Sequence, residues 1–128
     1  LITHDLGVVA GITDRIMVMY AGRQMEAGGV DDVFHRSNHP YTLGLMASLP
    51  RIDRGGGKLY SIAGQPPSLL NLPKGCVYHP RCPYADADAG CGSVRPELQE
   101  VGVAHAAACH RTDALTAVTV DTLLEAAE

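Results

Sequence analysis

The sequence predicts an α/β fold that continues into a loop-rich extension carrying four cysteines. Two observations predict the α/β part: apolar residues alternate over 16–20 and a second short strand follows a turn, and segments with helical spacing flank this pair. A third observation marks the extension, because residues 60–109 contain six of the chain's eight prolines and little periodicity. We therefore divide the chain into residues 1–50, a linker at 51–60, an extension at 61–111 and a tail at 112–128.

The composition indicates a soluble, globular chain and argues against a nucleic-acid binder. Hydrophobic residues make up 46% of the 128 residues, which is typical of an ordinary domain. The net charge is −4 and the ten Lys and Arg are scattered, whereas nucleic-acid binding needs a clustered basic surface. The longest apolar runs are far below the roughly 18 to 20 residues that cross a bilayer. We expect neither a membrane span nor a secretory leader.

The opening LITHDLGVV predicts a short buried strand that leads directly into a helix. Asp5 is placed to cap a helix from Leu6 to about Thr13, and Gly11 weakens that helix. A single terminal strand does not make a sheet, so we expect its neighbours to lie upstream in a longer protein.

The next segment, DRIMVMYAGRQMEAGG, predicts a β-hairpin. Ile16, Val18 and Tyr20 alternate with two methionines, and AGR turns the chain into a second strand at 23–27 that ends at two glycines.

Two helices are expected after the hairpin. The acidic residues of VDDVFHR suit the start of a short helix, because they favour the positive end of the helix dipole. In SNHPYTLGLMASLP, Pro40 fits the first helical turn, an apolar stripe follows it, and Pro50 ends the helix. The tail DALTAVTVDTLLEAAE has weaker helical spacing and is expected to be helical or frayed.

The linker contains GGGK at 55–58, which invites comparison with a phosphate-binding loop. The Walker pattern requires Gly at 52 and Ser or Thr at 59, and the sequence has Ile52 and Leu59. We therefore interpret this segment as a linker.

The four cysteines have the spacing C-x5-C-x8-C-x17-C. Without a secretory leader we expect a reducing compartment, in which clustered cysteines hold metal more often than disulfides. A structural zinc site usually takes pairs of ligands from tight C-x2-4-C knuckles, and no such pair is present. Iron–sulfur clusters accept more widely spaced ligands, so the spacing slightly favours a cluster and leaves zinc on the same four cysteines as the alternative.

The first third of the chain resembles the end of the nucleotide-binding domain of ABC transporters. The resemblance runs element by element through ITHDLGVVAGITDRIMVMYAGRQMEAGGVDDVF. It implies that His4 is the switch histidine, which contacts the γ-phosphate of ATP and helps to order the attacking water. An imidazole suits this role because it can donate a hydrogen bond to a phosphate oxygen as charge develops there.

Four further motifs narrow the resemblance: HPYTLGLMASLP, IAGQPPSL, GCVYHPRCPYA and ACH. They occur in the order typical of the C-terminal extension of ABC transporter ATPases for oligopeptides, dipeptides and nickel-peptides. The resemblance covers about residues 1–111. The fold it implies is the C-terminal end of a P-loop ABC nucleotide-binding domain, with its terminal strand, hairpin and helices, followed by a small cysteine-ligated extension.

The function implied by this resemblance is an ATP-hydrolysing subunit that powers peptide uptake, with ATP and Mg²⁺ as cofactors. The implied partners are a second ABC ATPase subunit, two membrane permease subunits and, indirectly, a peptide-binding protein. The implied location is the cytoplasmic face of the inner membrane. Because the sequence has no Walker A, signature or Walker B motif, we expect the 128 residues alone not to be catalytic. The alternative function is a stand-alone cysteine-ligated interaction module that binds no nucleotide.

The resemblance also implies a [4Fe–4S] cluster held by four cysteines. The positions that match are Cys76, Cys82, Cys91 and Cys109, with ADADAG as an insertion between the second and third. Three nearby histidines are competing ligands: His79, His105 and His110. A structural role is expected, since about fifty loop-rich residues otherwise have little to hold them, and redox sensing is the alternative.

Overall fold

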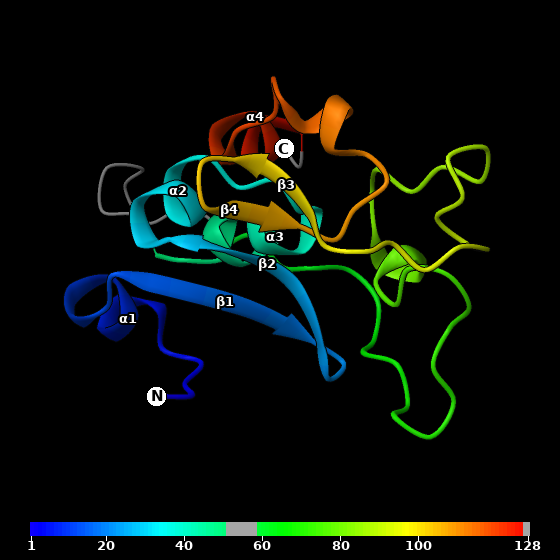
Figure 1. Cartoon of the computed structure of the whole chain (residues 1–128), viewed down its shortest axis with the longest axis horizontal. Helices are drawn as coiled ribbons and strands as arrows, with labels where there is room; N and C mark the ends of the chain where they lie inside the picture. Colours follow the sequence, from blue (N-terminus) through cyan, green and yellow to red (C-terminus); the bar gives the residue numbers. More distant parts are fainter. Residues whose placement is uncertain (51–58, 127–128) are drawn as a thin grey trace.

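The computed structural model describes residues 1–50 and 59–126, and these form an α/β structure around a four-stranded antiparallel sheet (Figure 1). The strand order is β1-β2-β4-β3, with β1 at Arg15–Tyr20, β2 at Arg23–Gly29, β3 at Gln99–Gly102 and β4 at His105–Ala107. The predicted α/β class is confirmed. Residues 51–58, which carry most of the predicted linker and the GGGK segment, lie outside the described residues.

The β1–β2 hairpin forms as the alternation predicts. Its two turn residues, Ala21 and Gly22, have φ of 50° and 76°, the left-handed conformation that a tight two-residue hairpin turn requires. A register shift follows Val18, and it leaves one extra residue in β2. Because of this bulge, two consecutive residues of β2, Met25 and Glu26, are both buried.

The helix α1 (Leu6–Ile12) begins as predicted, but the strand expected before it is not formed. The Asp5 side chain caps α1 by accepting a hydrogen bond from the Val8 backbone N–H at 3.1 Å. Residues 1–5 belong to no strand, and the side chains of Leu1 and Ile2 are 87% and 100% exposed. A strand needs a neighbour for its backbone groups, and no described segment pairs with these residues.

Both helices expected after the hairpin are present, and the tail contains a 3₁₀ helix at Thr112–Leu115 and one α-helix among the described residues. α2 (Val30–His35) packs on β2 and β1, and α3 (Pro40–Ala47) packs against α4 (Val120–Ala126). Their contact forms one apolar core, which consists of Leu43, Ala47, Cys109, Leu115 and Leu123. None of the helices among the described residues is long and apolar enough to span a membrane.

The extension contributes more to the fold than its sequence indicates. β4 pairs with β2, with Ala106 opposite Ala27 and Ala107 opposite Glu26, so one sheet contains strands from before and after the predicted linker. Val77 and Tyr78 are each 2% exposed and pack with Tyr20 and Met25 in a second core. The expectation that this segment buries little core is therefore wrong. Two strands of three and four residues were too short to give a periodic signal.

Candidate functional site

The fold brings the four cysteines together around one small cavity. Cys76, Cys82, Cys91 and Cys109 all line it, and all four are free thiols. Two of them, Cys91 and Cys109, are 7% exposed, and the other two are half-buried. Cys91 acts electrostatically on each of the other three thiols. We call these four residues the cysteine cluster.

A tight turn and a close backbone approach position the first three cysteines. A 3₁₀ turn at His79–Arg81 reverses the chain between Cys76 and Cys82. The Cys76 N–H donates to the Cys91 carbonyl at 2.9 Å, which joins the two loops. Gly75 permits this approach, because its φ is 72° and a Cβ there would lie 2.5 Å from the Cys91 oxygen.

The fourth cysteine follows β4, which brings it to the cluster from the sheet. The Ala108 N–H donates to the Met25 carbonyl at 2.8 Å and continues the contact with β2. The Arg111 backbone N–H donates to the Cys109 sulfur at 3.3 Å, and the Gln99 side-chain amide donates to the Cys109 carbonyl at 2.8 Å. The position of Cys109 therefore depends on the β3–β4 pairing.

Burial raises the pKa of three of these thiols. It raises the pKa of Cys82 to about 12 and that of Cys109 to about 11, and the neighbouring cysteines add to both shifts. Burial also raises the pKa of Cys76. At neutral pH these three sulfurs are protonated, so a metal would bind them only with release of protons.

The cysteine cluster is not arranged as a site for a single metal ion. In the part of the chain that the structure describes, no three His, Cys, Asp or Glu side chains are spaced to hold one. A single zinc ion requires every sulfur within about 2.3 Å of one point. The cavity volume is about 10 Å³, close to the roughly 10 to 15 Å³ that a single water molecule needs.

The histidines divide into those near the cysteine cluster and those elsewhere. His79 and His110 line the same cavity. The Nδ1 atom of His79 contacts the Cys76 carbonyl at 2.8 Å, and Nε2 of His110 contacts the Val94 carbonyl.

His105 does not line the cavity. Its Nε2 atom lies 2.7 Å from a Glu26 carboxylate oxygen in a buried pair. Burial raises the pKa of Glu26, while hydrogen bonds from His105 and from the Asn38 N–H oppose that shift. This pair joins β2 to β4.

His39 lines the cavity beside the cysteines, although the sequence indicated only a helix start at this position. It is 1% exposed, and its Nδ1 accepts a hydrogen bond from the Tyr41 N–H at 3.0 Å. That bond places the ring proton on Nε2, which has no partner of normal hydrogen-bond geometry among the described residues. Burial lowers the pKa of His39 to about 4, with a small opposing effect of the Ala108 backbone.

His4 lies far from the cysteine cluster. It is exposed and precedes the cap of α1, at the N-terminal end of the molecule (Figure 1). The loops that carry three of the four cysteines lie at the opposite end of the same view. The two candidate sites are therefore separate.

These features define a class of protein region: a small α/β unit whose sheet continues into a cysteine-bearing extension. Residues 25–91 match the family described as "Oligopeptide/dipeptide transporter, C-terminal region". The match covers more than half of the chain and includes most of the hairpin's second strand, the HPY segment and three of the four cysteines. The chain belongs to this family.

Curated relatives agree with the family. The chain is 50% identical over 87% of its length to "Oligopeptide transport ATP-binding protein OppD" of Escherichia coli, and 58% identical over 66% to the protein of the same name in Salmonella typhimurium. It is 44% identical over 91% to a "Putative peptide import ATP-binding protein" of Brucella ovis. The chain spans 32%, 25% and 36% of the lengths of these relatives, respectively.

Proposed function

We propose that this chain is the C-terminal part of the ATP-binding subunit of an ABC transporter that imports oligopeptides. The observation that carries the proposal is the family match over residues 25–91 together with the names of the relatives. In this proposal residues 1–50 end the nucleotide-binding domain and residues 61–111 form the family's extension. The subunit works with a second ATPase subunit and two permease subunits at the cytoplasmic face of the inner membrane.

Within that subunit, we assign the γ-phosphate contact to His4. Its side chain is exposed, and the hydrogen bond from Val8 to Asp5 fixes the start of the helix that follows. Both observations suit a side chain that contacts ATP held mainly by other parts of the subunit. The remaining groups that bind ATP and Mg²⁺ belong to motifs absent from these 128 residues, so the chain by itself does not hydrolyse ATP.

The test uses the whole transporter in proteoliposomes, with ATP hydrolysis and peptide uptake measured together. His4→Ala is expected to lower the rate of hydrolysis by about a hundredfold or more, because one preorganised donor to a developing charge contributes about that much. Nucleotide binding should remain. The matched control is His35→Ala, which removes an exposed histidine from α2. Equal hydrolysis by the His4 variant and the wild type would contradict the assignment.

We also propose that the cysteine cluster holds a [4Fe–4S] cluster. The side chains around the cavity suit an iron–sulfur cluster, because four free thiols line it. The buried Nε2–H of His39 also lies at this cavity and has no hydrogen-bond acceptor of normal geometry among the described residues. A four-iron cluster takes one thiolate per iron and is larger than a single ion, so it does not need the close sulfur spacing that zinc requires. The cavity has to widen for it, and the cysteines lie in turns and loops that can move apart more easily than a packed helix.

When bound, such a cluster supplies four covalent cross-links between segments and a centre that can take up an electron. We favour the cross-linking role, because the links would join residues 76–91 to Cys109 at the end of β4. Since the extension already has a core around Val77 and Tyr78, the cluster adds to the stability of this region and is not its sole support.

Purification without oxygen tests the cluster through its iron and acid-labile sulfide content. The wild-type chain is expected to contain about four of each, and Cys82→Ser is expected to lose most of both. Ser93→Ala, an exposed substitution near the same loops, is the matched control and should retain them. Zinc without iron in the wild-type protein would contradict the proposal.

A further inference from the structure

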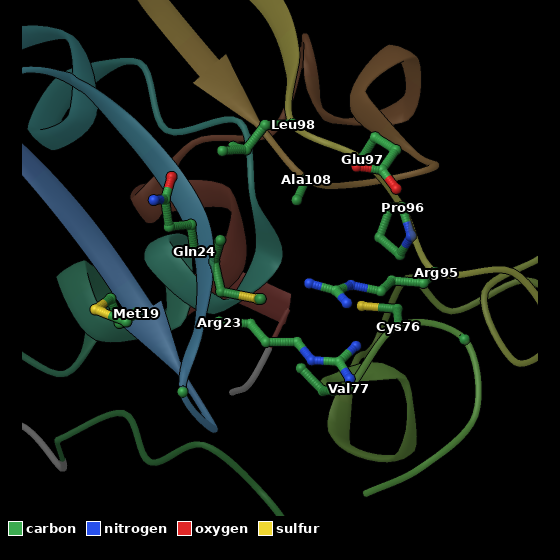
Figure 2. A pocket seen from close by; sticks show the side chains of 13 residues that line it. Met19, Arg23, Gln24, Cys76, Val77, Arg95, Pro96, Glu97, Leu98 and Ala108 are labelled. Carbon is green, nitrogen blue, oxygen red and sulfur yellow. The ribbon is translucent and has the colours of Figure 1, made fainter.

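A pocket of about 390 Å³ opens between the β1–β2 hairpin and the segment at 95–98 (Figure 2). We call it the hairpin pocket. One wall comes from the hairpin, and the other comes from residues 75–77 and 95–98 of the extension. Its volume falls in the range of about 300 to 1,000 Å³ that is typical of small-molecule sites.

Two arginines extend into the hairpin pocket. Figure 2 shows the side chains of Arg23, from the start of β2, and Arg95, from the facing segment, both directed toward Cys76. Neither guanidinium has a hydrogen bond or an ion pair with another residue in the part of the chain that the structure describes. Arg23 is near enough to Cys76 for its charge to act on that thiol.

Two unpaired guanidinium groups in one hollow repel each other, and an anion between them removes that repulsion. A guanidinium also presents its N–H donors in a planar fork that matches a carboxylate or phosphate. Glu97, the acidic residue of the lining, does not neutralise the two arginines. It forms no ion pair with a described residue, and in Figure 2 its carboxylate lies beside Pro96, away from both guanidinium groups.

The rest of the lining is partly apolar, which decides the kind of anion. Leu98, which is 41% exposed, supplies the accessible apolar surface on the facing side, whereas Met25 and Val77 are 3% and 2% exposed and have almost no area left to bury. A bare inorganic ion would leave this apolar surface in contact with water. A molecule that carries both a carboxylate and an apolar side chain would cover it and gain from the burial.

We propose that the hairpin pocket binds a small organic carboxylate with an apolar side chain, with Arg23 and Arg95 holding the carboxylate and Leu98 contacting the side chain. The proposal goes beyond the transporter assignment and does not depend on it. It requires only that the two walls of the pocket stay together, which the β2–β4 pairing ensures.

The test titrates the 128-residue chain with N-acetyl-leucine and follows the ligand by saturation-transfer NMR. Saturable binding is expected, and N-acetyl-leucinamide, which has the same side chain without the charge, should bind at least about tenfold more weakly. Arg95→Gln should weaken binding by about ten- to a hundredfold, because a hydrogen bond to a charged group contributes about 1.5 to 3 kcal/mol. Arg95 is exposed, so this change does not threaten the fold. Arg23→Gln should have a similar effect.

The matched control is Arg36→Gln, which removes the same charge from an exposed position where the guanidinium already pairs with Asp32. Its affinity for N-acetyl-leucine should equal that of the wild type. Four results would each overturn the proposal: no saturable binding, equal binding of the amide, equal binding of inorganic phosphate, or an equal loss of affinity in the Arg36 variant.

Discussion

The buried pair of Glu26 and His105 offers a direct test of how β2 and β4 are held together. The Glu26 side chain is 0% exposed, and its two oxygens accept hydrogen bonds from the Asn38 N–H at 2.9 and 3.0 Å. One of these oxygens also lies 2.7 Å from Nε2 of His105, which is 5% exposed. Glu26→Leu leaves two donors without an acceptor in a buried setting.

Each unsatisfied buried donor costs about 1 to 3 kcal/mol, and Glu26→Leu leaves two of them, the Asn38 N–H and Nε2 of His105. We therefore expect Glu26→Leu to lower the free energy of unfolding by about 2 to 6 kcal/mol. Glu26→Gln keeps an acceptor for Asn38 and should cost about 1 kcal/mol. In the double variant Glu26→Leu/His105→Leu, much of the loss should return, because only the Asn38 donor is still unsatisfied.

Urea unfolding followed by far-UV circular dichroism measures these differences, since the chain has no tryptophan. The matched control is Asp32→Asn, which breaks the exposed pair with Arg36 and should leave the free energy of unfolding almost unchanged. The reasoning fails if Glu26→Leu costs no more than this control. It also fails if the losses of the two single leucine variants simply add in the double variant.

Three further predictions concern His39, Gly75 and the first fifty residues. Because burial lowers the pKa of His39 to about 4, the native state does not take up the proton that the unfolded state binds below about pH 6.5. Stability should therefore fall by up to about 3 kcal/mol as the pH drops from about 6.5 to about 4, and urea titrations of His39→Gln should lack most of this dependence. Gly75→Ala should lower the melting temperature clearly, because the added Cβ would lie 2.5 to 2.7 Å from the backbone at 91–93 and the φ of this residue is 72°. The control is Gly11→Ala, which should be neutral or stabilising because the added Cβ meets nothing within 4 Å. A peptide of residues 1–50 should show no cooperative thermal transition by circular dichroism, since β2 loses β4 and α3 loses α4; a sharp transition would refute this.

Much of the first fifty residues follows from local chemistry. The alternation of Ile16, Val18 and Tyr20 with two methionines predicted β1, and the turn at AGR predicted the hairpin. Asp5 caps α1 and Pro40 opens α3, as their side chains dictate. The strand expected at the opening of the chain is not formed among the described residues, because a strand depends on its neighbours and local sequence supplies none.

The strands of the extension could not be predicted from local sequence. β3 and β4 are too short for periodicity to identify, and they exist because β2 offers β4 an edge to pair with. The sequence pointed to the four cysteines as one set, and the fold brings them to one cavity, while their actual ligand remains a proposal. Nothing local indicated that His39 would join them there, or that Glu26 and His105, 79 positions apart, would form a buried pair.

The sequence by itself determined the hairpin, the three predicted helices and the membership of the four cysteines in one group, because turns, caps and alternating burial act over a few residues. Only the tertiary structure decided that one sheet spans both parts of the chain, that His39 is buried beside the cysteines, and that Arg23 and Arg95 share the hairpin pocket. Those features depend on contacts between residues tens of positions apart, whose geometry is set by packing and not by any local pattern.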